Sequence, residues 1–402
     1  MQDNFFSSNR QKLSSRLGGG LVVLTAYTST QKQNDMAAPF QQEANFWYLT
    51  GIEQPDWLVI IDGANGDEWL VRPEVDEVHE IFDGSLSVEQ ARQVSGIRRV
   101  VSHDEGMTLL RNLAKKHSIV HTIDNPPYSD RFSFSLNPAI TANKKMLERM
   151  FTSVVDCQKD LAKLRAIKQP EEIKAIQRAI DVTIEGFTTT KEALRIAKYE
   201  YQLEAEFTYH FKRTDGSDHA YDPIVAAGKN ACTLHYIDND TKLGAKQLVL
   251  MDVGARVGGY AADITRTYAK GAPTKRQKEV HQAVAAAHQD IISLLAPGLL
   301  VEEYIRQVDE RMKSALNEVG LLKNMDDTET YRKYFPHAIS HGLGIDVHDS
   351  LGGTRYLEPG MILTVEPGIY IPEESIGVRI EDDILITANG HRNLSAALST
   401  DL

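Results

Sequence analysis

The sequence predicts a two-domain α/β protein, and three observations lead to this expectation. The chain has 402 residues, which is enough for two domains that each bury a core. Short apolar runs alternate with helical patterns up to about residue 155. Beyond that point, long amphipathic patterns accompany two strand–turn–strand stretches that carry acidic residues. We therefore expect a smaller mixed α/β domain over residues 1–155, closed by a helical linker, and a second α/β (α+β) domain over residues 156–402.

The first domain is predicted from short apolar runs separated by turn residues. Asp62-Gly63-Ala64-Asn65-Gly66 is typical of a hairpin connection. Strands are expected at 21–26, 57–61, 69–72, 99–101 and 119–123, and helices at 88–94 and 107–116, followed by a helical linker through 146–154. This half contains no phosphate loop and no dinucleotide-binding fingerprint.

The second domain is predicted to begin with a long helix. Pro170 followed by Glu171 and Glu172 favours a helix N-terminus, because proline suits the first turn and acidic side chains suit its positive end. Apolar residues then recur every three or four positions to 187, and the same spacing predicts helices at 280–294 and 301–319. We expect two or more of these helices to cover one face of a sheet whose strands carry the acids.

An acidic pair lies in the first strand–turn–strand stretch of this domain. Asp252 follows an apolar, β-branched run, and Asp263 lies at an equal distance beyond a turn centred between Val257 and Gly258. Residues placed symmetrically about a hairpin turn face each other, and two half-buried carboxylates repel unless a cation separates them. The alternative is a pair of solvated hairpin aspartates with no ligand.

A second acidic pair makes the metal interpretation the stronger one. Glu366 and Glu381 are nearly symmetric about a loop between two further strands, and His341 lies between the two hairpins in the sequence. Four carboxylates and one imidazole suit one or two hard or borderline divalent ions, Mn²⁺ above all, with Co²⁺ and Zn²⁺ as alternatives. A structural zinc site would require thiolates, which these stretches lack.

Composition narrows the classes of partner and compartment. The formal net charge of -12 argues against a nucleic acid partner. Only Cys157 and Cys232 occur, so no disulfide framework is expected, which fits a reducing cytoplasm. Three glycines interrupt the apolar run at 17–26, so we expect a buried strand there and not a signal peptide. No apolar run approaches the ~20 residues that cross a bilayer, so no membrane partner is expected.

The acidic motifs resemble those of the pita-bread metallopeptidases, and within them aminopeptidase P and prolidase, which cleave Xaa-Pro bonds. The eleven-residue interval between the two aspartates agrees with that family. Asn45-Phe46-Trp47-Tyr48-Leu49-Thr50-Gly51 is similar to the signature of the aminopeptidase P N-terminal domain. The resemblance implies a C-terminal pita-bread domain with two divalent metal ions held by Asp252, Asp263, His341, Glu366 and Glu381, the first and last of these bridging the metals.

The resemblance also implies roles for residues beyond the metal ligands. Glu366 would act as general base, with His235 and His348 stabilising the oxygen of the tetrahedral intermediate. A lone histidine is more often structural, and only the family context favours a substrate role for His235. The further positions carried over by the resemblance or by strand alternation are His337 and Tyr370 at the substrate, Arg379 as a support for Glu381, Thr265 beside Asp263, and Asp35 at the rim of the site.

The activity implied is a dinuclear-metal exopeptidase that removes an N-terminal residue preceding proline, so the expected partners are proline-containing peptides. The rival within this chemistry is prolidase, which is restricted to Xaa-Pro dipeptides. A metal-free binding module and a creatine-hydrolysing relative are alternatives from other classes, but both have lost ligands that are present here. The family also implies a homodimer or a homotetramer.

Overall fold

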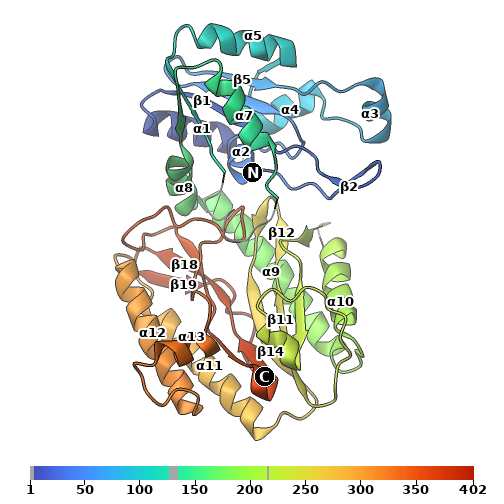
Figure 1. Cartoon of the computed structure of the whole chain (residues 1–402), viewed down its shortest axis with the longest axis vertical. Coiled ribbons are helices and arrows are strands. Elements are labelled where there is room, and N and C mark those ends of the chain that lie inside the picture. The colour runs from blue at the N-terminus through green and yellow to red at the C-terminus, as the bar shows by residue number, and fades with distance from the viewer. Residues whose placement is uncertain (1–3, 126–134, 215–216) are drawn as a thin grey trace. The chain divides into compact units, whose positions relative to one another are not determined.

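The computed structural model describes residues 4–125, 135–214 and 217–402. The chain divides into two compact units, Met1–Leu164 and Arg165–Leu402, which are described separately below (Figure 1). The boundary expected at residue 155 lies within the first unit, because the strand that contains this residue joins the first unit's sheet. Among the described residues, no helix combines the length and the apolar character that crossing a membrane requires.

The first unit is built on a six-stranded mixed sheet in the order β6-β5-β4-β1-β7-β8. Its strands are β1 (Leu21–Thr25), β4 (Leu58–Asp62), β5 (Asp67–Val71), β6 (Arg99–Val101), β7 (Ile119–Thr122) and β8 (Ser153–Asp156). The β1–β4 and β4–β5 pairs are antiparallel and the other three pairs are parallel. The mixed α/β character and the five predicted strands are confirmed. A small hairpin of β2 (Gln31–Gln33) and β3 (Met36–Ala37) stands apart from this sheet.

The first unit contains more helices than the sequence predicted, since only those at 88–94 and 107–116 and a helical linker through 146–154 were expected. Its helices are α1 (Phe5–Arg16), α2 (Ala44–Thr50), α3 (Glu77–Phe82), α4 (Val88–Ser95), α5 (His103–Leu113) and α7 (Ala139–Glu148), and α8 (Gln158–Ala166) runs across the boundary into the second unit. Helix α5 begins before the predicted 107, because Ser102 and Glu105 form a capping box. The continuous helical linker is wrong, because Val154 pairs with Val120 in the sheet.

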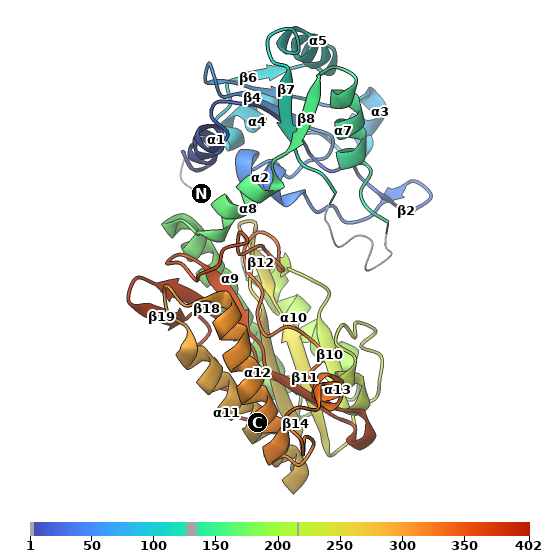
Figure 2. The ribbon, with the colours of Figure 1, turned by 60° about the vertical axis from the view of Figure 1, so that its left-hand side comes forward.

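The second unit contains two pairs of helices, each packed on its own group of strands. The helices are α9 (Pro170–Ala193), α10 (Glu200–Arg213), α11 (Lys275–Leu294), α12 (Val301–Glu318) and the short α13 (Thr328–Tyr334). Pro170 lies in the first turn of α9, as predicted, and Gln169 and Glu172 form its capping box. Helices α9 and α10 pack on the strands between residues 218 and 270, and α11 packs on those between 362 and 379 (Figure 2).

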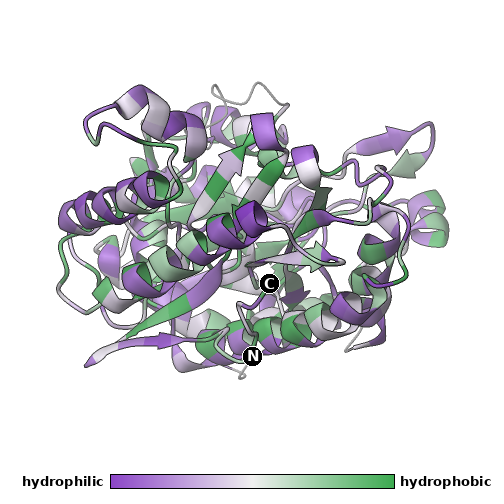
Figure 3. Cartoon of the chain, turned by 90° about the horizontal axis from the view of Figure 1, so that it is seen from below, coloured by the Kyte–Doolittle hydropathy of each residue, from purple (hydrophilic) through white to green (hydrophobic). Residues whose placement is uncertain are grey.

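The strands of the second unit form short antiparallel sheets. They are β9 (Asp218–His219), β10 (Ile224–Ala227), β11 (Gln247–Val253), β12 (Ala255–Val257), β13 (Tyr260–Ala261), β14 (Ile264–Lys270), β15 (Ile362–Val365), β16 (Gly368–Ile371), β17 (Ile376–Arg379), β18 (Asp382–Thr387) and β19 (Gly390–Asn393). Their orders are β10-β11-β14, β13-β12-β9, β15-β18-β19 and β16-β17. Hydrophobic and hydrophilic residues alternate along the long helices, as expected for helices that cover a sheet on one face only (Figure 3).

Candidate metal centre

The aspartate hairpin turns one residue later than the sequence analysis placed it. Gly258 and Gly259 both have positive φ, 56° and 84°, as the two central residues of a type I′ turn require. Asp252 therefore lies opposite Thr265, and not opposite Asp263 as expected. Asp263 still reaches the same face of the sheet, because it precedes Thr265 by two residues and strand side chains alternate.

The glutamate pair is placed as its symmetry predicted. Val365 lies opposite Asp382 in one ladder, and Gly368 lies opposite Arg379 in the next. Both ladders share one register, which places Glu366 opposite Glu381. An isolated bridge between Thr265 and Glu381 joins this ladder to the aspartate hairpin, so the two acidic pairs come together.

The segment before β15 brings His341 to the acids. The His341 backbone N–H donates to Thr364 Oγ1 at 3.1 Å, and the Thr364 N–H donates back to the His341 carbonyl at 3.0 Å. These bonds align the histidine with the strand that leads to Glu366. His341 Nε2 lies 3.5 Å from Asp263 Oδ2 and 3.6 Å from Glu366 Oε1. One imidazole thus contacts an acid from each hairpin.

The five predicted donors occur in overlapping groups whose ligand atoms lie within 4.8 Å of one another. The groups are Asp252 with Asp263 and Glu381, His341 with Glu366 and Glu381, and Asp263 with His341 and His348. Asp252, Asp263 and Glu381 are buried, with only 7%, 5% and 2% of their surfaces exposed. The two acidic pairs and the histidine therefore form one cluster.

The electrostatics of the cluster show why these side chains fit a cation. Burial, reinforced by neighbouring carboxylates, raises the pKa of Asp263 and of Glu381 well above their ordinary values. Burial raises the pKa of Glu366 to about 8, although Arg379 opposes the shift. One guanidinium cannot balance four adjacent carboxylates, so the full set can ionise together only when more positive charge is supplied. The oxygen-rich donor set suits hard divalent ions.

Arg379 supports a different acid from the one expected. Its Nη2 donates to Asp252 Oδ2 at 2.5 Å, its Nη1 donates to the Tyr370 hydroxyl at 2.9 Å and its Nε donates to Thr265 Oγ1 at 3.1 Å. Glu381 instead accepts a 2.7 Å hydrogen bond from Thr265 Oγ1. The expectation that Arg379 directly holds Glu381 is wrong, because Thr265 stands between them and relays the interaction.

Tyr221 is a member of the site that the sequence analysis missed. Its hydroxyl lies 2.5 Å from Asp252 Oδ1 and 2.6 Å from Asp263 Oδ1, and burial beside these acids raises the pKa of Tyr221 well above its ordinary value. The hydroxyl therefore remains protonated and acts as a donor. No local spacing indicated this contact, because it depends on the long-range pairing that sets Ile224 opposite Asp252.

The predicted substrate-side residues lie around the cluster. His337 Nε2 lies 2.8 Å from the Tyr370 hydroxyl, and its Nδ1 lies 3.5 Å from Glu366 Oε2. The His348 ring packs against the His341 ring with their centroids 4.3 Å apart. Burial lowers the pKa of His337 and of His348, and the nearby His235 adds to both shifts. His235 and His348 are exposed, whereas His337 is half-buried.

Asp35 stands apart from these residues in the chain. It is exposed in the turn between β2 and β3 of the first unit, whereas the cluster consists of residues of the second unit. Its assignment to the site stays a prediction.

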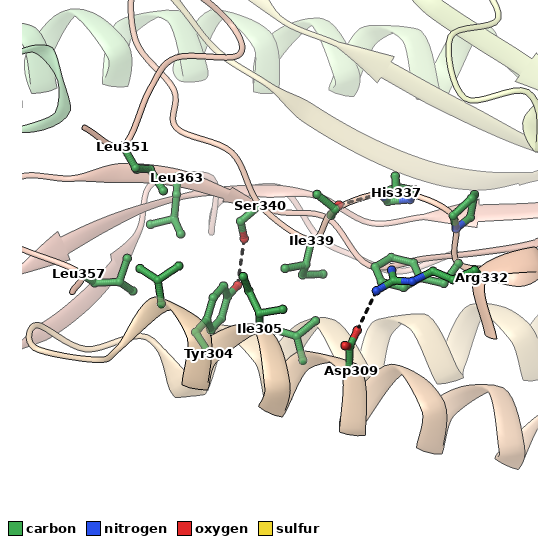
Figure 4. Close-up of a pocket in the computed structure, with 15 residues that line it drawn as sticks. Tyr304, Ile305, Asp309, Arg332, His337, Ile339, Ser340, Leu351, Leu357 and Leu363 are labelled. Carbon is green, nitrogen blue, oxygen red and sulfur yellow. Dashed lines mark hydrogen bonds and ion pairs between the residues drawn. The ribbon is translucent and has the colours of Figure 1, made fainter. Parts of the chain in front are cut away.

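A pocket of about 380 Å³ lies between α12 and the segment that leads to His341 (Figure 4). Its lining is mainly apolar and includes Ile305 and Leu363, and His337 contributes to one end. The Tyr304 hydroxyl and Ser340 Oγ are 2.9 Å apart across it. This contact ties the segment that carries His337 and His341 to the helix beneath it.

Comparison with known proteins agrees with this geometry. The description "Metallopeptidase family M24" matches residues 174–388, which include all five donors. The chain belongs to metallopeptidase family M24. A second match, to the aminopeptidase P N-terminal domain, covers residues 6–121 of this M24 member. The N-terminal domain match lies in the first structural unit and the M24 match lies in the second. The second unit is the pita-bread domain that the sequence predicted.

Individual M24 relatives align with nearly the whole chain. A Xaa-Pro aminopeptidase of Haemophilus influenzae is 33% identical, over 95% of this chain and 91% of its own length. Human Xaa-Pro aminopeptidase 3 is 31% identical over 93% of this chain and 78% of its own length. The structure of Escherichia coli aminopeptidase P with the inhibitor Pro-Leu superimposes with a TM-score of 0.88 at 30% identity, covering 100% of this chain and 96% of that one.

Proposed function

We propose that this M24 member is a dinuclear-metal aminopeptidase that hydrolyses the bond between an N-terminal residue and a following proline. The observation that carries the proposal is the convergence of two acidic pairs and His341 in one buried cluster. The N-terminal domain match and the Xaa-Pro aminopeptidase relatives support the choice of substrate.

Asp252, Asp263, His341, Glu366 and Glu381 would hold the two metal ions. Mn²⁺ is the ion we propose first, because the donors are four carboxylates and one imidazole, with Co²⁺ and Zn²⁺ as alternatives. When bound, such a pair supplies Lewis acidity that polarises a carbonyl and lowers the pKa of water.

Glu366 is the residue proposed to accept and return a proton. Its side chain is 15% exposed, compared with 10% for Asp252 and 6% for Asp263, so it is the most accessible of these acids. It is near ring nitrogens of both His337 and His341. A carboxylate so placed can take a proton from water and deliver it to the proline nitrogen, which leaves as a secondary amine.

The histidines are proposed to bind the substrate. His235 and His348 would donate to the oxygen that becomes negative when the peptide carbon turns tetrahedral. His337, held by the Tyr370 hydroxyl, would line the leaving-group side. Proline has no N–H and a fixed ring, so a pocket that fits this ring and asks for no N–H donor selects against other residues.

The test is product analysis by mass spectrometry with Mn²⁺ supplied. Xaa-Pro-Yaa peptides should be cleaved to free Xaa and Pro-Yaa, far faster than matched Xaa-Ala-Yaa peptides. Pro-Leu should inhibit, since an aminopeptidase P relative has been solved with this dipeptide as an inhibitor. Turnover of Xaa-Pro dipeptides alone, with no cleavage of tripeptides, would replace the proposal by prolidase activity.

We also propose a homo-oligomer, either a dimer or a tetramer. Helix α3 has no buried residue, and Val78, Ile81 and Phe82 are exposed by 60%, 80% and 81%. Adjacent apolar side chains of this size are typical of a surface that another chain covers. Light scattering during size exclusion should give a mass above that of one chain, and Phe82→Asp should lower it.

Two free cysteines fit the proposed cytoplasmic location.

A further inference from the structure

A short loop connects the ligand histidine to the substrate-side histidine. It runs from Gly342 to Asp349, and an isolated β-bridge between these two residues closes it, with the Asp349 N–H donating to the Gly342 carbonyl at 2.8 Å. The Ala261 N–H donates to the Gly344 carbonyl at 2.9 Å, which ties the loop to the aspartate hairpin. His348 precedes the closing residue, so the way this loop is closed sets where its ring lies.

The closing residue carries a buried charge. Asp349 Oδ1 lies 2.9 Å from Arg165 Nη2, and Asp349 Oδ2 lies 3.5 Å from Lys168 Nζ. The three side chains are 4%, 6% and 1% exposed respectively, so water screens these contacts little. Arg165 Nη2 also lies 2.6 Å from Asp346 Oδ2, and the guanidinium therefore binds two carboxylates of the same loop.

The carboxylate of Asp349 is packed against the loop backbone. A Cβ added at Gly344 would lie 2.1 Å from Asp349 Oδ2, so this approach requires glycine. The backbone N–H of Lys168 donates to the Gly360 carbonyl at 2.9 Å, which fixes the ammonium-bearing residue from the other side. Within the described part of the chain, His348 has the His341 ring contact but no hydrogen bond to its own ring. Its position therefore depends on its backbone.

We propose that Asp349, held by Arg165 and Lys168, is a positioning residue that fixes His348 for the substrate. The inference rests on the proposed function, in which His348 binds the reacting carbonyl. Residues outside the metal cluster would then determine the geometry of the substrate side. Because Asp349 acts only through His348, its contribution should disappear when that imidazole is absent.

A double-mutant cycle tests this dependence. Asp349→Asn keeps the shape of the side chain but removes its charge. The kcat/KM for a Xaa-Pro-Yaa peptide should fall at least ~10-fold, the usual cost of losing a residue that orients a functional side chain, while the bound metal is unchanged. In the background of His348→Ala, the same change should have little further effect. Multiplicative losses in the double variant would overturn the proposal, because they would mean that Asp349 acts independently of His348.

A matched control separates positioning from general destabilisation. Glu68→Gln removes the carboxylate partner of buried Arg10 in the first unit, and it should lower Tm without lowering kcat. Arg165→Lys keeps the positive charge but loses the planar guanidinium that can contact two carboxylates. It should therefore lower kcat/KM by less than Asp349→Asn does. This variant serves as the test if Asp349→Asn does not fold, and an unchanged kcat/KM would then contradict the proposal.

A measurement without turnover distinguishes this inference from the proposed function. The imidazole resonances of His348 in metal-free protein should shift in Asp349→Asn and stay in place in Glu68→Gln. Unchanged resonances would overturn the positioning role even if Xaa-Pro peptides are cleaved. If instead the resonances shift but wild-type protein cleaves no Xaa-Pro peptide, the proposed function fails and the loop geometry stands.

Discussion

Raising the pH of the metal-free protein from 6.5 to 8 should lower its free energy of unfolding. Glu366 has a folded pKa of about 8 against an ordinary value of 4.5, because it is buried among other acids. A carboxyl group whose pKa is raised in the folded state contributes its full stabilisation below its ordinary pKa of 4.5. This contribution is lost as the pH rises towards and through the folded-state pKa of about 8. The window above pH 6.5 is the informative one, because the lowered pKa values of His337 and His341, about 3 and 4, affect stability mainly below it.

The magnitude follows from the proton that the folded state retains. Each proton that the folded state retains and the unfolded state has lost lowers the free energy of unfolding by about 1.4 kcal/mol per pH unit. Glu366 alone therefore accounts for a loss of about 2 kcal/mol between pH 6.5 and 8. For a unit of this size, the loss corresponds to a Tm lower by about 4–8 °C. Asp263 and Glu381, whose pKa values are also raised, would add to the loss.

Circular dichroism melts in EDTA at the two pH values measure this loss. Glu366→Gln should reduce the slope of stability against pH by the contribution of about one proton, because an amide does not titrate. Added Mn²⁺ should reverse the trend, since the metal binds deprotonated carboxylates. A Tm that is equal or higher at pH 8 in EDTA would refute the argument that the acids crowd one another without a cation.

Three further substitutions test separate parts of the site. Asp263→Asn should retain less metal than wild type after dialysis, measured by elemental analysis, because a carboxylate ligand loses its charge and keeps its shape. His348→Ala should keep its metal but lose on the order of 10²-fold in kcat/KM, the usual cost of a transition-state hydrogen bond, and full activity would make it a structural histidine. Arg379→Met should lower the free energy of unfolding, measured by urea titration, by about 3–5 kcal/mol. The reason is that it leaves the buried Asp252 carboxylate without its guanidinium partner. An unchanged urea midpoint would argue against this pairing.

Local patterns determined much of the fold. Apolar runs placed five strands of the first unit's sheet within a residue or two, and periodicity with Pro170 placed the start of α9 correctly. Where a local signal was overlooked, as with the capping box at Ser102 and Glu105, the predicted helix start was displaced by about one turn. The linker failed for another reason, since the apolar residues near Val154 suit either a helix or a strand, and only pairing with β7 decides between them.

The sequence alone determined which donors belong together, and only the tertiary structure decided how they are connected. Residue type and order, together with the resemblance to a metallopeptidase family, sufficed to name Asp252, Asp263, His341, Glu366 and Glu381. The symmetry expected for the two aspartates was displaced by one residue, because Asp252 lies opposite Thr265. The contacts of Tyr221 and of Arg379 join residues from segments far apart in the sequence, so no spacing could reveal them. The same holds for the link from Arg165 to the loop of His348, which spans most of the second unit. Contacts of this kind depend on which sheets pack together, and that is decided by burial of the whole core and not by any local pattern.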